Sequence, residues 1–320
     1  MRKAAVILLP ALLLLSCSRE QTERRLEVVF EVSETHTKAV DEGATAWLDA
    51  LVFTSDGALY SVSHSDGVTV SASVPKGREV SWYLLSGAPA SLFADISDED
   101  DLLSREIKLS DCSEALVMHA SDSDTFEDPT GVTATLGRCV SKVLLGSVYA
   151  DFLATGAYGS SATLERVWLV NARGGVAVGG PSAGALWYNR LDRDPGLPAG
   201  IAGFLCKEVG LDITDVSRQT LDIPLYCCPN PTEDDVTSLV SDSWSPRHTR
   251  LVLEMTLDDG TNYYPVTLPV MACNTCYVVS EVHLLGPGSA SPDIPVDRTA
   301  ISLSVTLSPW GGAETEFELE

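Results

Sequence analysis

The sequence predicts an all-β protein of two β-sandwiches that follow an export signal. Short segments that alternate apolar and polar residues recur about every eight to twelve residues, with turn signals between them. Helical spacing of apolar residues occurs in one segment, 92–103. The N-terminus has the charged and apolar regions of a secretory signal, directly before a cysteine.

The first residues predict a bacterial lipoprotein signal. Arg2 and Lys3 form a positive start, and residues 4–15 form an apolar run that is shorter than the roughly 20 residues needed to span a bilayer. The run ends in Leu-Leu-Ser-Cys, a lipobox in which Ser16 is the small residue before cleavage and Cys17 receives the lipid. A serine after this cysteine favours the outer membrane.

The strands follow one another along the chain. An apolar residue stands at every second position from Leu26 to Val32, and the residues between are Glu27, Val29 and Glu31. This alternation predicts a strand with one apolar face. A loose region rich in Gly, Pro and Ser is expected from about 171 to 246. Asp258–Asn262 has the composition of a hairpin turn. Further strands are predicted at 47–53, 68–74, 80–85, 115–119, 132–136, 140–148, 164–170, 252–257, 263–270, 276–285 and 301–307.

Composition restricts the function. The formal net charge of -24 argues against nucleic-acid partners, because phosphate contacts require basic surfaces. Of eight cysteines, seven remain if lipid occupies the first, so at least one has no disulfide partner within the chain. The Cys273–Cys276 C-x-x-C lies between predicted strands, which favours a structural role. The five histidines lack metal-binding spacing, and we expect no cofactor.

One segment matches the pattern of a serine hydrolase. Gly180–Gly184 fits G-x-S-x-G, with Ser182 as the nucleophile. That motif requires a strand, a sharp turn and a helix within an alternating α/β sheet, and the surrounding sequence does not predict such alternation. A hydrolase at Ser182 is therefore a remote alternative, and the protein is not expected to be an enzyme.

Several segments stand out together in their order along the chain. They are Leu116–Ala120, Arg138–Val143, Thr261–Val266, the Gly-Pro-Gly stretch within Leu285–Asp293, and Ile301–Trp310 with its terminal tryptophan. Together they resemble the FimA/Mfa-type fimbrillins of Bacteroidales, the subunits of type V pili. The first two resemble the L-I-M-x-A segment and the R-x-V-x-K/R strand of that family, and the other three its late hairpin strand, its linker before the final segment and its last strand.

The resemblance implies an all-β fold of two tandem Greek-key (transthyretin-like) β-sandwich domains after the lipoprotein signal peptide. The division expected along the chain is a signal peptide at 1–16, a lipidated propeptide with a placeholder strand at 17–38, an N-terminal β-sandwich at 39–150 and a C-terminal β-sandwich with a terminal tail at 151–320.

The resemblance also implies a way of assembly by β-strand addition. Leu26, Val28, Phe30 and Val32 would form the placeholder strand in the N-terminal sandwich. A trypsin-like surface protease would cut between Lys38 and Ala39; Arg24–Arg25 is a poorer site because it precedes the strand. The opened groove would receive a donor strand from another subunit, for which the tail residues are Thr315, Phe317 and Leu319.

The implied partners are other fimbrial subunits, the protease, the outer membrane through the lipid on the precursor, and an adhesion receptor that the sequence does not identify. The implied location is first the outer membrane and then a cell-surface fimbrium. Stalk, tip and anchor roles stay open. A surface glycan-binding lipoprotein is an alternative, with an aromatic platform drawn from Trp168, Trp187, Tyr188 and Trp244.

Overall fold

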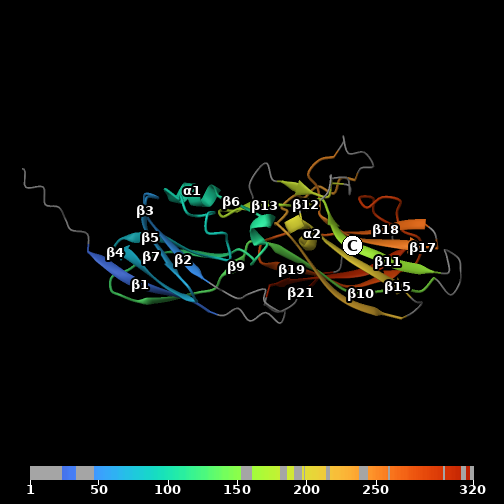
Figure 1. The fold of residues 1–320 in the computed structure, drawn as a ribbon, viewed down its shortest axis with the longest axis horizontal. Helices are drawn as coiled ribbons and strands as arrows, with labels where there is room; N and C mark the ends of the chain where they lie inside the picture. The colour runs from blue at the N-terminus through green and yellow to red at the C-terminus, as the bar shows by residue number, and fades with distance from the viewer. Residues whose placement is uncertain are drawn as a thin grey trace, which may run out of the picture.

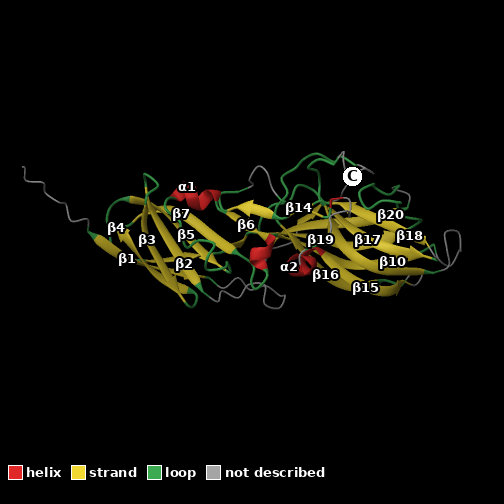
Figure 2. Cartoon of the chain, turned by 45° about the horizontal axis from the view of Figure 1, so that its top comes forward, coloured by secondary structure: helices red, strands yellow, loops and turns green. Residues whose placement is uncertain are grey.

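The computed structural model describes residues 24–33, 47–152, 161–180, 186–190, 197, 199–213, 217–237, 244–258, 260–297, 300–310 and 315–317. These residues form an elongated molecule in which two β-sandwiches lie end to end (Figure 1). Strands make up most of both halves, and helices are few and short (Figure 2). The predicted all-β fold of two tandem sandwiches is confirmed.

The first sandwich packs a three-stranded sheet against a five-stranded one. The smaller sheet has the order β4-β1-β8, with β1 at Arg25–Val32, β4 at Thr69–Pro75 and β8 at Gly131–Ala134. The larger has the order β3-β2-β5-β7-β9, with strands at Leu59–Ser65, Leu48–Thr54, Glu79–Ser86, Met118–Thr125 and Gly137–Arg138.

The second sandwich also has two sheets. One has the order β16-β10-β19-β20-β21, with strands at Gln219–Cys227, Ser141–Ala150, Thr275–Leu284, Ile301–Pro309 and Thr315–Phe317. The other has the order β15-β11-β17-β18, with strands at Cys206–Ile213, Ala162–Val170, Arg250–Leu257 and Gly260–Thr267.

Short elements lie around the junction of the two sandwiches. Strand β6 (Glu106–Lys108) pairs with β13 (Gly175–Ala177), which links a segment between β5 and β7 of the first sandwich to one that follows β11 of the second. The remaining elements are α1 (Glu99–Ser104), the 3-10 helix η1 (Leu109–Cys112), β12 (Ala172–Arg173), β14 (Trp187–Tyr188) and α2 (Ala199–Leu205). Neither α-helix of the described part of the chain could cross a membrane.

Strand β10 pairs with β16 and β19, so Ser141–Ala150 belongs to a sheet of the second sandwich. Two details of the prediction differ from the structure. The helix expected at 92–103 is confined to α1, where the Asp98 side chain accepts a hydrogen bond from the Asp101 N–H at 2.8 Å and fixes the helix start.

The region 171–246, expected to be loose, contains α2 and the long strands β15 and β16. Leu221, Ile223, Leu225 and Cys227 alternate on one face of β16, but Pro224 hides the pattern because proline usually interrupts a strand. Among the described strands β16 pairs with β10 alone, so it is an edge strand and can hold a proline.

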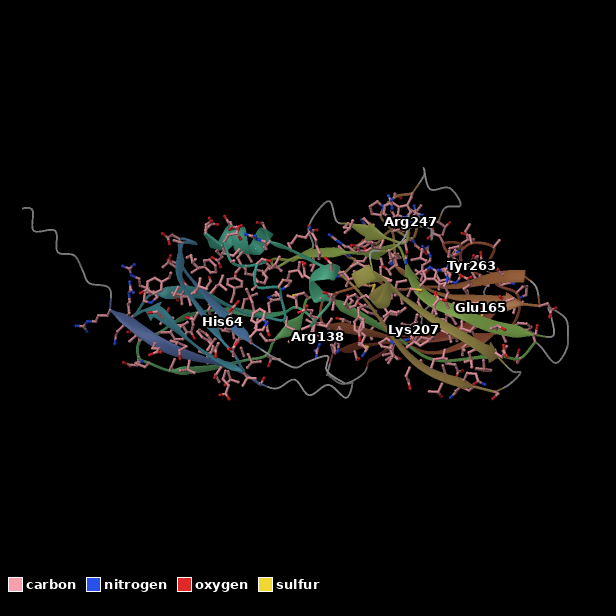
Figure 3. The ribbon with its side chains drawn as sticks, viewed as in Figure 1. His64, Arg138, Glu165, Lys207, Arg247 and Tyr263 are labelled. Atoms are coloured by element: carbon pink, nitrogen blue, oxygen red, sulfur yellow. The ribbon has the colours of Figure 1, made fainter. Side chains whose placement is uncertain are left out.

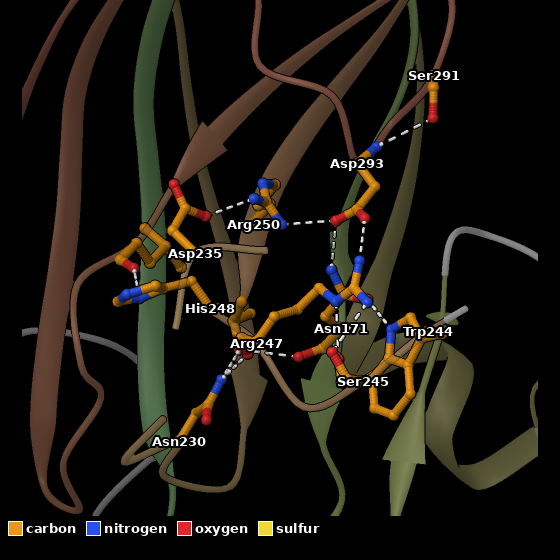
Figure 4. Close-up of polar contacts among 12 residues, drawn as sticks. Asn171, Asn230, Asp235, Trp244, Ser245, Arg247, His248, Arg250, Ser291 and Asp293 are labelled. Carbon is orange, nitrogen blue, oxygen red and sulfur yellow. Dashed lines mark hydrogen bonds and ion pairs between the residues drawn. The ribbon is translucent and has the colours of Figure 1, made fainter. Parts of the chain in front are cut away.

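A buried ionic network fixes the linker after β19 (Figure 4). Asp293 accepts from Arg247 Nη1 at 2.7 Å and from Arg250 Nη1 at 2.5 Å, and all three side chains are fully buried. Asn171 donates to the same carboxylate at 2.7 Å. Arg250 also contacts Asp235, which is 48% exposed. Burial lowers the pKa of Arg250, and Asp293 acts against that shift.

We predict that Asp293→Ala lowers the free energy of unfolding by about 3–5 kcal/mol, because it leaves two buried guanidinium groups without their shared carboxylate. Urea unfolding followed by tryptophan fluorescence measures this. Asp235→Ala is the matched control, with an expected loss below about 1 kcal/mol because the Asp235 side chain is half exposed and Arg250 keeps its bond to Asp293. Equal losses for the two variants would contradict this account of the network.

Candidate assembly site around strand β1

Strand β1 is the central strand of its sheet although it is the first strand of the chain. It pairs antiparallel with β4 over seven residue pairs and parallel with β8 over four. Just beyond the ladders, the Val32 N–H donates to the Val68 carbonyl at 2.9 Å and the Val29 N–H to the Thr130 carbonyl at 3.0 Å. Within the described part of the chain, β4 and β8 are therefore joined in one sheet only through β1.

One face of β1 is part of the hydrophobic core. Val28 and Phe30 are fully buried and Val32 is 6% exposed. Phe30 lies against Trp82 of β5, with ring centroids 5.1 Å apart. Burying each such side chain contributes about 1.5–3 kcal/mol. The apolar face of β1 therefore fills the space between the two sheets of the first sandwich.

The other face of β1 lies at the surface. Arg25, Glu27, Val29 and Glu31 are exposed, and Val29 is 43% exposed. Leu26, at the start of the apolar face, is half-buried and packs against the same core. The alternation read from the sequence is thus the alternation of core and surface in the structure.

The connections of β1 distinguish it from the other core strands. After Val32, Ser33 donates its N–H to the Ala134 carbonyl at 3.0 Å, and the chain reaches β2, in the opposite sheet, only after residue 47. A single cut between residues 33 and 47 would separate β1 from the rest of the sandwich, leaving only non-covalent contacts to hold it. The predicted sites Cys17, Lys38 and Ala39 lie outside the described residues.

The predicted donor segment is attached to the second sandwich. Thr315 and Phe317 lie in β21, which pairs antiparallel with β20 over three residue pairs, whereas β20 pairs with β19 over nine. Leu319 lies outside the described residues. The short ladder makes β21 the most weakly paired strand of its sheet.

Trp310 marks the point where the tail begins. Its side chain is 7% exposed, the Arg138 guanidinium lies 4.7 Å from its ring centroid, and the Tyr226 ring stacks on it at 5.8 Å. The backbone N–H of Trp310 donates to the Asn274 carbonyl at 2.9 Å. Figure 3 shows Arg138 between the two halves of the molecule. The sequence pointed to this tryptophan, but not to the cation and the tyrosine that hold it.

The other candidate sites have little support among the described residues. Ser182 itself lies outside them; the strand before it, β13, pairs antiparallel with β6 in a two-stranded sheet, which differs from the setting of a hydrolase nucleophile. No group of three metal-ligating side chains occurs in the described part. Of the aromatic platform, Trp168 is buried, while Trp187 and Trp244 are half-buried and contact each other edge to face at 5.4 Å.

We predict that Phe30→Ala lowers the free energy of unfolding of the uncut chain by about 3–5 kcal/mol, because it leaves a cavity against Trp82. Val29→Ala, on the exposed face of the same strand, should change it by less than about 0.5 kcal/mol. Chemical denaturation monitored by tryptophan fluorescence compares the two. A Phe30 variant as stable as the Val29 variant would mean that β1 contributes little to the core.

Comparison with solved structures finds proteins that are similar to this chain. No protein-family model matches the sequence, and a search of curated proteins finds no match. A candidate cell adhesion protein from Parabacteroides distasonis superposes with a TM-score of 0.65 at 15% identity, covering 90% of this chain and 97% of that one.

Two proteins of Porphyromonas gingivalis are also similar. The fimbrilin FimA matches with a TM-score of 0.62 at 13% identity, over 89% of this chain and 97% of its own. The tip fimbrial protein Mfa3, in a C-terminally truncated form, matches with a TM-score of 0.53 at 12% identity, over 90% of this chain and 100% of its own. At these identities the likeness establishes the fold, and the predicted resemblance to FimA/Mfa-type fimbrillins is confirmed at that level: this chain has the two-sandwich fold of these fimbrial and cell adhesion proteins.

Proposed function

We propose that the protein is a structural subunit of a cell-surface fimbria and contributes to adhesion. The observation that carries this proposal is the position of β1, which is central in its sheet, buried on one face and attached to the sandwich through one segment, 33–47. The likeness to fimbrial proteins over nine-tenths of the chain supports it. The function needs no catalytic group, and its partners are other subunits.

The proposed assembly starts from a lipoprotein held at the outer membrane through Cys17. A trypsin-like surface protease cuts between Lys38 and Ala39, and β1 can then leave. Its departure exposes Trp82 and the apolar residues around it, and it leaves backbone groups of β4 and β8 without partners. Unpaired edges of this kind readily accept an added strand. A strand from a neighbouring subunit therefore fills the groove.

The tail fits the role of that strand. Thr315, Phe317 and Leu319 alternate with glutamates, so one face is suited to the core and the other to water. In its own subunit the tail has three residue pairs with β20. In the groove, β1 makes seven residue pairs with β4 and four with β8, and these positions become available to a strand that replaces it. The larger number of backbone hydrogen bonds favours transfer of the tail into the groove of the next subunit.

A non-polymerising anchor is the nearest alternative. An anchor would keep the lipid, and it would also keep β1 paired with β4, as β1 is in this structure. The cut distinguishes the two roles, because a stalk or tip subunit must lose β1 to accept a neighbour.

We predict that protein taken from the cell surface begins at Ala39, as measured by N-terminal sequencing. Lys38→Gln should leave the chain uncut and unassembled because a trypsin-like protease requires a basic residue before the cut. Arg25→Gln is the control and should be processed normally. A chain found only with lipid on Cys17 would contradict the stalk and tip roles and favour the anchor.

We predict that deleting residues 313–320 abolishes filaments while the monomer stays folded, because the tail adds only the three-pair strand β21 to its own sandwich. Electron microscopy of surface material detects filaments, and circular dichroism checks the fold. Phe317→Ala should weaken assembly strongly, whereas Glu316→Ala, on the other face, should have little effect. Normal filaments from the deletion variant would rule out the tail as donor.

A further inference from the structure

Four cysteines come together where the two sandwiches meet. Cys112 ends η1, Cys139 precedes β10, Cys228 follows β16 and Cys273 precedes β19. We call these four residues the thiol cluster. No disulfide joins any of the seven described cysteines. Cys139 follows Arg138 directly in the chain, and Figure 3 shows Arg138 between the two halves of the molecule.

Cys139 and Cys273 lie on neighbouring segments. The Sγ of Cys273 is 3.5 Å from the Cys139 carbonyl oxygen, and the next residue, Asn274, donates its N–H to the Val140 carbonyl at 3.1 Å. Adjacent strands lie about 4.7–4.9 Å apart, within the Cα separation of about 4.4–6.8 Å that a disulfide spans. Cys273 is also the thiol with the largest electrostatic effect on Cys139.

Cys112 and Cys228 are held against one short segment. The Cys228 N–H donates to the Arg173 carbonyl at 2.9 Å, and the Leu109 N–H, at the start of η1, donates to the Gly174 carbonyl at 2.9 Å. Among the neighbouring thiols, Cys112 has the largest electrostatic effect on Cys228. Cys228 and the helix η1 that ends at Cys112 are thus both hydrogen-bonded to the neighbouring residues Arg173 and Gly174.

Burial determines when these thiols can react. It raises the pKa of Cys112 to about 11, and it raises the pKa values of Cys139 and Cys228 well above the usual range. The thiolate is the reactive form, so the folded chain holds very little of it at neutral pH. We therefore expect these thiols to be oxidised while the chain is folding, before burial, and a disulfide formed then would be shielded from reductants.

We propose that the thiol cluster is a cross-linking site in which two disulfides, Cys139–Cys273 and Cys112–Cys228, fasten the junction of the sandwiches. This inference rests on the export that the proposed function includes, because disulfides persist in oxidising compartments. For each bond, a cysteine thiolate attacks the disulfide of an oxidised dithiol oxidoreductase. The second cysteine thiolate then displaces the enzyme, which leaves as the dithiol carrying the two electrons and two protons.

The cross-links would strengthen the part of a filament subunit that carries load between its two ends. Cys139 lies between the last strand of the first sandwich and β10, and Cys273 lies next to β19, the central strand paired with β10. Cys112 belongs to the segment that leaves the first sandwich between β5 and β7, and Cys228 to the end of β16. Cys206, Cys227 and Cys276 remain thiols.

The test maps the disulfides of the full chain after export to a bacterial periplasm. Thiols are trapped with N-ethylmaleimide, and the denatured chain is digested without reductant and examined by mass spectrometry. We expect the two linked peptide pairs Cys139–Cys273 and Cys112–Cys228, with Cys206 alkylated. Four alkylated cluster cysteines, or any other pairing among them, would overturn the proposal.

Stability gives a second readout. Reductant should lower the Tm of the exported wild-type chain by roughly 5 °C or more, and this shift should be smaller in Cys139→Ala/Cys273→Ala. Cys206→Ala, outside the cluster, should keep the full shift. The same Tm with and without reductant in the wild type would overturn the cross-links. Filaments whose cluster thiols are all reduced would overturn the cross-links and leave the fimbrial function standing. If the proposed function fails, refolding the purified chain in a glutathione buffer still tests which cysteines pair.

Discussion

The insertion of β1 between β4 and β8 is the interaction on which the first sandwich depends. These two strands do not pair with each other, and Phe30 lies against Trp82 of the opposite sheet. The same strand supplies the backbone partners of the sheet and part of the core. The chain leads from β1 to β2, in the opposite sheet, through residues 33–47. In the assembly that we propose, a cut in this segment frees β1 and leaves the first sandwich incomplete.

The second sandwich is built differently. Its central strand β19 pairs with β10 on one side and with β20 on the other. The buried ion pairs of Asp293 fix the linker that leads from β19 towards β20. Trp310, held by Arg138 and Tyr226, anchors the end of β20. The chain thus has a core strand, β1, near its start and a strand with a short ladder, β21, near its end. In the polymer that we propose, the second strand replaces the first.

Local patterns in the sequence predicted most of the strands because period-two alternation reflects which face is buried. Leu26 to Val32 were identified in this way, and so were the strands that became β4, β5, β10 and β19. The position of β1 between β4 and β8 could not be predicted, because pairing between segments about one hundred residues apart leaves no local mark, least of all when it is parallel.

Other features were missed for definable reasons. Strand β16 was hidden by Pro224, which an edge strand tolerates. The carboxylate of Asp293 and its two arginines are far apart in the sequence and converge only through the fold. The grouping of Cys112, Cys139, Cys228 and Cys273 has the same origin, since spacing along the chain contains no information on which cysteines meet at the junction.

The central claim is that, in the filament, the tail of one subunit occupies the groove between β4 and β8 of the next. The most direct measurement is photo-crosslinking of assembled filaments that carry a photoreactive residue at position 317, followed by mass spectrometry of the linked peptides. We expect crosslinks to Thr69–Pro75 or Gly131–Ala134 of a different subunit. Crosslinks only to the subunit's own Ile301–Pro309, in intact filaments, would contradict the claim.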